Sequence, residues 1–324
     1  AAIFLSGLIL FGQGNKSVGT IVAISSYASY FWQPIMNLGN IFNNFINNIA
    51  YLERIFETMD EPVTVKDAKD AVEMPKIRGE VTFDHVNFSY DASKQILNDV
   101  SFTVKPGESV ALVGPTGAGK STIVNLISRF YNVNGGRVLI DGQDISQVTI
   151  HSLREQMGIM MQDSFIFSGD IEDNIRYGKL DATREEIVKA SRTVCADEFI
   201  SKMPDRYQTE VRERGSMLSQ GQKQLISFAR TLLSDPAILI LDEATSSIDV
   251  QTEKALQTGL NAMLKGRTSF IIAHRLSTIR NCDKIMYIDN GGIMESGTHD
   301  ELMAKKGYYY KLYTAQLDEV QKAG

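Results

Sequence analysis

A glycine-rich segment has the residue types and spacing that bind phosphate. It lies between the apolar run 110–113 and the helix-like stretch 123–127. Glycines let consecutive backbone N–H groups point toward an anion, and a helix N-terminus adds a favourable dipole. The expected nucleotide contacts are Gly114, Thr116, Gly117, Ala118, Gly119, Lys120, Ser121 and Thr122. We expect Lys120 to reach the β- and γ-phosphates and the Ser121 hydroxyl to help hold Mg²⁺.

Two carboxylates follow a second apolar run. Residues 237–241 are all apolar and are followed by Asp242 and Glu243. Such a run predicts a buried central strand, and ligands of open parallel sheets bind beyond the carboxyl ends of the strands. Asp242 is therefore expected in the magnesium shell, and Glu243 is expected to orient or deprotonate the water that attacks the γ-phosphate. A helix cap is the alternative reading of the acidic pair, and the phosphate loop disfavours it.

A third motif, Leu-Ser-Gln-Gly-Gln at 218–222, precedes an apolar-periodic stretch at 225–230. In this order and spacing the chain resembles the ATP-binding cassette (ABC) family, more closely its multidrug-type exporters. The resemblance implies that Ser219, Gly221 and Gln222 form the family's signature, a helix N-terminus that closes over ATP held by a partner's phosphate loop.

The same resemblance assigns roles to four further residues. It implies that Tyr90 stacks on adenine and that Gln162 meets Mg²⁺ and the attacking water. It also implies that Asp249 lies in a loop that crosses to the partner, and that His274 contacts the γ-phosphate. ATP and Mg²⁺ are the implied cofactors, and the implied activity is that of an ATPase.

The expected fold is an α/β P-loop ATPase domain with a RecA-like core, an antiparallel β subdomain and a helical subdomain, preceded by a transmembrane α-helix. Local patterns add a strand-rich segment at 79–90, a helical arm over about 151–233, a hairpin turn at 290–292 and a capping box of Thr298 with Glu301. The predicted divisions are 1–58 (end of the transmembrane domain), 59–77 (linker), 78–317 (nucleotide-binding domain) and 318–324 (tail).

The N-terminal segment lacks charge from Ser17 to Leu52. We expect a bilayer span over residues 20–38, continuing toward the cytosol through 40–55, with residues 1–11 ending an earlier span. Asn37, Asn40, Asn44 and Asn47 recur at helical spacing. This stripe suits helix packing better than substrate contact, and both readings stay open.

Composition separates three functional classes. With 33 basic and 39 acidic residues and a net charge of −6, the chain offers no basic field for nucleic acid. A soluble ATPase of the chromosome-maintenance or DNA-repair type would need a long heptad insertion, which is missing. A nucleotide-binding regulator without turnover would be expected to lack Glu243 or His274. An ATP-driven exporter is therefore favoured.

One residue departs from the family pattern, because Gln220 stands where the signature usually has glycine. The resemblance then favours the catalytically intact subunit of a heterodimer, with a homodimer that tolerates Gln220 as the alternative. The prediction is the C-terminal portion of a half-transporter in the cell membrane, multi-pass, with a cytoplasmic ATPase domain. Its expected partners are a second half-transporter subunit, the lipid bilayer and a small-molecule cargo. That cargo is amphiphilic or drug-like, with lipid or peptide as the alternative.

Overall fold

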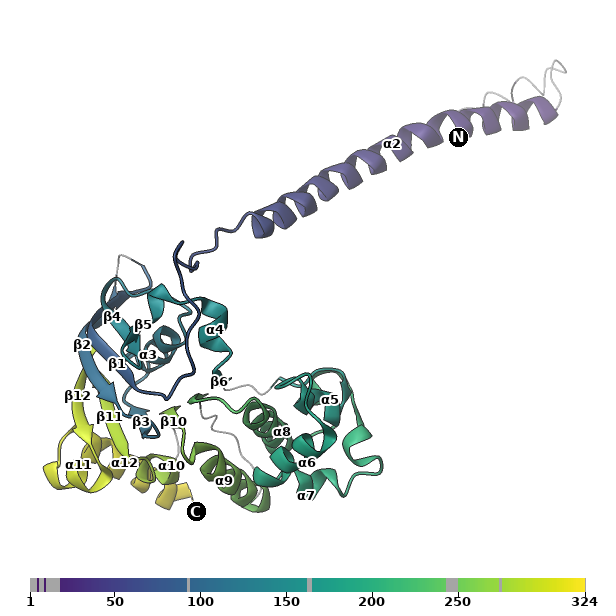
Figure 1. Cartoon of the computed structure of the whole chain (residues 1–324). Coiled ribbons are helices and arrows are strands. Elements are labelled where there is room, and N and C mark those ends of the chain that lie inside the picture. The colour runs from purple at the N-terminus through teal and green to yellow at the C-terminus, as the bar shows by residue number, and fades with distance from the viewer. Residues whose placement is uncertain are drawn as a thin grey trace. The chain divides into compact units, whose positions relative to one another are not determined.

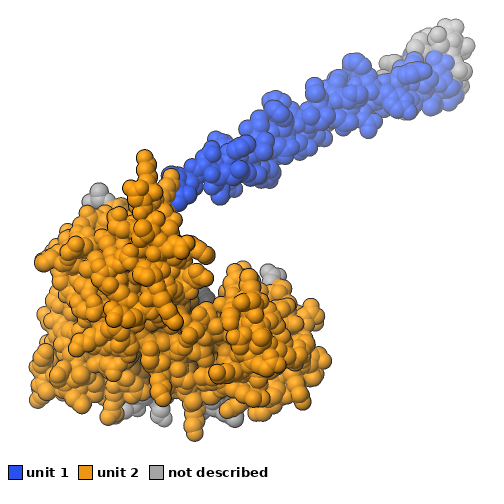
Figure 2. All heavy atoms as spheres, in the orientation of Figure 1, with its two compact units in different colours: residues 1–63 blue, residues 64–324 orange. Residues whose placement is uncertain are grey.

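The computed structural model describes residues 5, 9, 18–91, 94–161, 165–242, 250–273 and 276–323. Residues 1–63 and 64–324 form two compact units, which Figure 2 shows in different colours.

The first unit is dominated by one long helix, α2 (Val18–Met59), of 42 residues. None of its side chains is buried within the chain, and the four asparagines at 37, 40, 44 and 47 all lie exposed on it. The helix itself was expected from the sequence and is confirmed.

The expected membrane span over 20–38 is not borne out. Among the described residues no helix combines the length and the apolar character needed to cross a bilayer. The prediction rested on missing charge, and missing charge is not the same as high hydropathy. Serines, tyrosines, Gln33 and Asn37 offset the isoleucines and valines of this segment, and Asn40 does the same just beyond it.

The second unit is built around a six-stranded sheet in the order β12-β11-β3-β10-β9-β6. Neighbouring strands from β11 to β6 are parallel, and β12 pairs antiparallel with β11. The strands are β3 (Ser109–Val113), β6 (Met157–Met160), β9 (Ile238–Asp242), β10 (Thr268–Ile272), β11 (Lys284–Asp289) and β12 (Gly292–Gly297). Because β6, β9, β10 and β3 are neighbours that run in one direction, their carboxyl ends share one edge of the sheet.

An antiparallel four-stranded sheet, in the order β2-β1-β4-β5, lies in the same unit. It contains β1 (Val81–Ser89), β2 (Gln95–Val104), β4 (Gly135–Ile140) and β5 (Gln143–Asp144). A third pair joins β7 (Gly169–Asp170) to β8 (Glu210–Val211).

Two hydrophobic clusters cover the faces of the central sheet. Strand β3 is buried along its whole length, and its residues alternate between the clusters. Ala111 and Val113 join the cluster that includes α8 and α9, whereas Val110 and Leu112 join the cluster that includes β1, β2 and α3. Burial on both faces explains why the strand sequence is continuously apolar.

Helices surround both sheets (Figure 1). They are α3 (Lys120–Ile127), α4 (Ile150–Arg154), α5 (Ile171–Arg176), α6 (Arg184–Thr193), α7 (Asp197–Ile200), α8 (Gln220–Leu233), α9 (Val250–Leu264), α10 (Leu276–Arg280), α11 (His299–Lys305) and α12 (Tyr308–Ala323). Helix α8 packs against α5, α6 and α9, and Figure 1 shows α5 to α8 gathered on one side of this unit.

Several local predictions are confirmed. The turn between β11 and β12 has positive φ at Asn290 (48°) and Gly291 (75°), as a tight hairpin requires. Thr298 and Glu301 form a capping box at the start of α11. One prediction needs correction, because the range 151–233 expected to form the arm also contains a strand of the central sheet, β6, with α4 before it and α5 to α8 after it.

Candidate nucleotide site

The phosphate loop leaves β3 and enters α3. Gly114 (φ 141°) passes so close to β11 that an added Cβ would lie 2.1 Å from the carbonyl oxygen of Ile288. Gly119 (φ 106°, ψ 7°) is the N-cap of α3 in the left-handed region, and it has no side chain to accept from the N–H groups of the first turn. The close approach and the left-handed backbone explain glycine at these two positions. The helix N-terminus keeps N–H groups available to an anion.

Lys120 begins α3 and folds back over the loop. Its Nζ donates hydrogen bonds to the carbonyl oxygens of Gly114 and Pro115, each at 2.8 Å. Burial lowers the pKa of Lys120, and the negative charge of Asp242 acts in the opposite direction. Lys120 and Asp242 therefore lie within electrostatic range of each other, although β10 separates their strands, β3 and β9.

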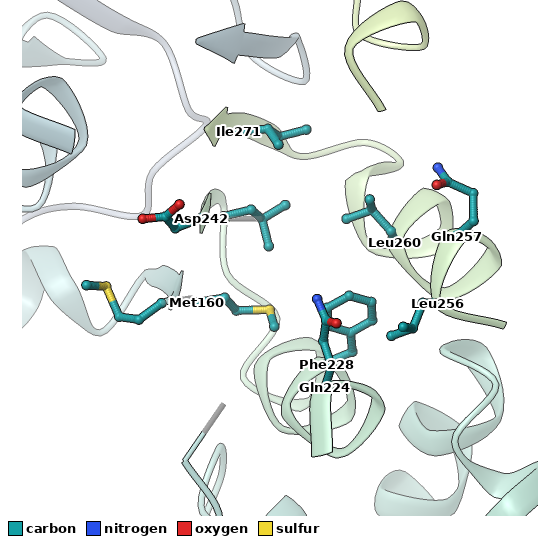
Figure 3. Close-up of a pocket in the computed structure, with 10 residues that line it drawn as sticks. Met160, Gln224, Phe228, Asp242, Leu256, Gln257, Leu260 and Ile271 are labelled. Atoms are coloured by element: carbon teal, nitrogen blue, oxygen red, sulfur yellow. The ribbon is translucent and has the colours of Figure 1, made fainter. Parts of the chain in front are cut away.

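Asp242 ends β9 beside a small cavity of about 30 Å³. The cavity is lined by Met160 and Met161 from the β6 end, by Gln224 and Phe228 of α8, and by residues of α9 and β10. In Figure 3 the Asp242 carboxylate points away from the apolar side formed by Phe228, Leu256 and Leu260. The half-buried carboxylate thus lies on the opposite side of the cavity from these apolar side chains.

The oxygen donors near the phosphate loop suit a Mg²⁺ ion that is also bound by substrate phosphates, as opposed to a metal held by protein ligands alone. Among the described residues no group of three or more His, Cys, Asp or Glu side chains could hold a metal. Magnesium is typically bound by one or two protein oxygens plus substrate phosphates. The exposed Ser121 and the Asp242 carboxylate, both hard oxygen donors, fit that pattern.

Tyr90 lies directly against the first turn of α3. Its hydroxyl is 3.2 Å from Oγ1 of Thr122, a buried residue of that turn. The Tyr90 ring also contacts Phe88 and Tyr131. Sequence reasoning singled out Tyr90 and missed Tyr131, for which the only signal was the aromatic pair Phe130-Tyr131 after α3.

The signature residues cap α8. Ser219 Oγ accepts from the Gln222 N–H at 3.2 Å, and Gln222 Oε1 accepts from the Ser219 N–H at 3.0 Å. Gly221 is buried, whereas Ser219 and Gln220 are exposed. Within the described part of the chain, none of these residues hydrogen-bonds to the phosphate loop. The structure does not bring the signature into the Lys120 site.

Four predicted site residues, Gln162, Glu243, Asp249 and His274, lie outside the described residues. Three of them follow described strand ends closely. Glu243 follows Asp242 of β9, Gln162 comes two positions after β6, and His274 comes two positions after β10. The described ends of β6, β9 and β10 lie at the same sheet edge as the end of β3, where the phosphate loop begins.

Known proteins resemble the chain over this region and beyond it. A family profile described as "ABC transporter" matches residues 97–246. The uncharacterized ABC transporter ATP-binding protein YknV of Bacillus subtilis (strain 168) is 51% identical over 316 residues, covering 98% of this chain and 52% of that protein. The putative multidrug export ATP-binding/permease protein YgaD of the same organism is 48% identical over 305 residues, covering 94% and 53%.

A solved structure of a bacterial Atm1-family ABC exporter with ATP bound is also similar. It is 41% identical, with a TM-score of 0.76, and the match covers 95% of this chain and 54% of that one. The chain thus spans about half the length of the relatives that it matches. With the phosphate loop, the sheet order and these similarities together, the chain is an ABC transporter ATPase, and the matched region is its ATP-binding domain.

Proposed function

We propose that this ATPase hydrolyses Mg-ATP at the edge where β3, β6, β9 and β10 end, and that hydrolysis drives export across a membrane. The observation that carries the proposal is that the phosphate loop and Asp242 lie at the same edge of the parallel sheet. The phosphate loop follows β3. Asp242 is the last residue of β9 and lies within electrostatic range of Lys120. The predicted Gln162, Glu243 and His274 follow β6, β9 and β10 in the chain.

Each residue has a distinct proposed role. On ATP binding, the Lys120 ammonium exchanges its two carbonyl acceptors for phosphate oxygens. Ser121 and Asp242 would hold Mg²⁺, with Gln162 as a further ligand, and the bound ion would supply positive charge beside the phosphates. Glu243 orients and deprotonates the attacking water, and His274 contacts the γ-phosphate.

Substitution of Glu243 tests hydrolysis separately from binding. Glu243→Gln should lower turnover at least about 10²-fold while ATP still binds, because the amide keeps the shape of the side chain but cannot accept the proton. Lys120→Met is the matched comparison and should weaken binding itself. Near-wild-type turnover of Glu243→Gln, measured as phosphate release at saturating ATP, would refute the role of Glu243.

We propose that the signature of this chain serves an ATP molecule bound by a partner subunit. The exposure of Ser219, and its hydrogen bonds within its own helix cap rather than to the loop at Lys120, support action in trans. Gln220 in place of glycine favours a heterodimer in which the partner's own site is the impaired one. Mixing Ser219→Ala chains with Glu243→Gln chains should restore part of the lost activity in a homodimer and none in an obligate heterodimer.

The proposed cargo is an amphiphilic or drug-like small molecule, and the ATPase domain acts at the cytoplasmic face of a membrane exporter. The name of the YgaD protein, a putative multidrug exporter 48% identical to this chain, supports that class. Efflux of a lipophilic dye from cells that express the exporter, with Glu243→Gln as the control, tests the cargo class. Dye retention equal in both would argue for another cargo.

A further inference from the structure

Three aromatic rings pack together beside the first turn of α3, the helix that follows the phosphate loop. The ring of Tyr90 lies 4.9 Å from that of Phe88 and 4.9 Å from that of Tyr131, with interplanar angles of 86° and 84°. Phe88 and Tyr131 are themselves 5.7 Å apart. Edge-to-face packing of this kind is attractive beyond the burial of apolar area, so each ring restrains the others.

Hydrogen bonds hold the segment of Tyr131 against the end of β1. The backbone N–H of Asn134 donates to the carbonyl oxygen of Asn87 at 3.0 Å. The Asn134 side chain accepts from the N–H of Ser89 at 2.6 Å. Tyr131 follows α3 whereas Tyr90 follows β1, so this pairing fixes the distance between two rings that are 41 positions apart in the sequence.

Tyr90 is restrained at both ends of its side chain. Its ring contacts Phe88 and Tyr131, while its hydroxyl is hydrogen-bonded to Thr122 of α3. Even so, 47% of its surface is exposed, which leaves area for a flat ligand group. An exposed tyrosine without such contacts would lose rotamer freedom on binding, and a restrained one has lost it already.

We propose that Tyr131 is a positioning residue for ATP: it holds the Tyr90 ring in the orientation that stacks on the nucleobase. The inference rests on the proposed role of Tyr90 in the nucleotide site. Tyr131 acts through the Tyr90 ring, which its own ring contacts together with that of Phe88, and the Tyr90 ring is the part of the site proposed to meet the base. Its removal should therefore weaken ligands that carry a base and spare ligands that consist only of phosphates.

The test measures binding of two ligands to the full chain by titration calorimetry. The ligands are Mg-ATP and Mg-tripolyphosphate, which lacks base and sugar. Tyr131→Leu should raise the dissociation constant of ATP about three- to tenfold and leave that of tripolyphosphate within about twofold. Tyr131→Phe should behave like the wild type, because it keeps the ring. In steady-state hydrolysis, Tyr131→Leu should raise KM and leave kcat unchanged.

The adjacent residue supplies the matched control. Phe130 is 40% exposed and Tyr131 is 41% exposed, but the Phe130 ring packs under the guanidinium of Arg154 at 4.6 Å. Phe130→Leu should leave both dissociation constants unchanged. Tyr131→Met, which keeps the bulk without the ring, carries the test if the leucine variant unfolds below the temperature of the measurement.

The outcomes separate this inference from the proposed function. Equal ATP affinity of wild type, Tyr131→Leu and Tyr131→Met overturns the inference while leaving ATP binding in place. Equal loss of ATP and tripolyphosphate affinity also overturns it, because the effect would then be a general distortion of the loop. If the wild type binds neither ligand, or if Lys120→Met binds ATP as the wild type does, the proposed nucleotide site itself is wrong.

Discussion

Arg129 is expected to be one of the most costly polar residues to replace in the ATPase domain. Its side chain is 3% exposed. Nη1 donates to the carbonyl oxygen of Val148 at 2.5 Å, and Nη2 donates to that of Lys66 at 3.0 Å. Asp67 lies 3.7 Å from Nη1. The guanidinium thus joins the end of the phosphate-loop helix to residues 66–67, which lead into the domain.

The expected cost of Arg129→Met follows from these contacts. The change removes two charge-assisted hydrogen bonds and leaves two carbonyl oxygens short of a donor, at about 1–3 kcal/mol each. It also removes a buried Nε that has no partner among the described residues, and this offsets part of the loss. The net cost should be about 2–4 kcal/mol, which in a domain of this size lowers Tm by about 5–15 °C.

Two further variants distinguish the buried hydrogen bonds from simple charge pairing. Asp67→Asn should cost under about 1 kcal/mol, because Asp67 is 44% exposed and an asparagine oxygen can still accept from the N–H of Ile150. Arg137→Met is the surface control, since Arg137 pairs with Asp84 and is 59% exposed. Thermal unfolding followed by circular dichroism is the assay. A Tm of Arg129→Met within about 1 °C of that of Arg137→Met would refute the reasoning.

Three other predictions concern the nucleotide site, the packing of Gly178 against α8, and the signature residue Gln220. Lys120→Met should weaken ATP binding at least about 10²-fold, and calorimetry that shows an unchanged affinity would contradict the assignment. Gly178→Ala should destabilise the arm by about 1–3 kcal/mol, because the new Cβ would lie 2.0 Å from the carbonyl oxygen of Arg230. Gly142→Ala, where nothing lies within 4 Å, should cost only the strain of its φ of +79°, so equal Tm losses for both would count against the steric argument. Gln220→Gly should change hydrolysis by the heterodimer less than about threefold, and a large gain in turnover would favour a homodimer.

The motifs of the phosphate loop and of strand β9 could be predicted from the sequence because their constraints are local. Gly114 and Gly119 need backbone angles that other residues rarely adopt, and the run into Asp242 is apolar because its strand is buried on both faces. Family resemblance added the order of the remaining motifs. The absence of charged residues led to a wrong prediction of a membrane span in α2, because its uncharged polar residues keep its hydropathy below that of a membrane span.

Other features appeared only when distant segments met in the fold. Strand β6 is four residues long, too short for its periodicity to distinguish it from the helices around it, and only pairing with β9 defines it. The contacts of Tyr131 with Tyr90, and of Arg129 with residues 66–67, join segments separated by 41 and about 60 positions. ATP binding could be predicted from the chain alone, because a phosphate loop depends on residue types at fixed short spacing. The side chains that support the loop, such as Tyr131 and Arg129, became visible only in the folded protein, because such contacts depend on how separate strands and helices pack.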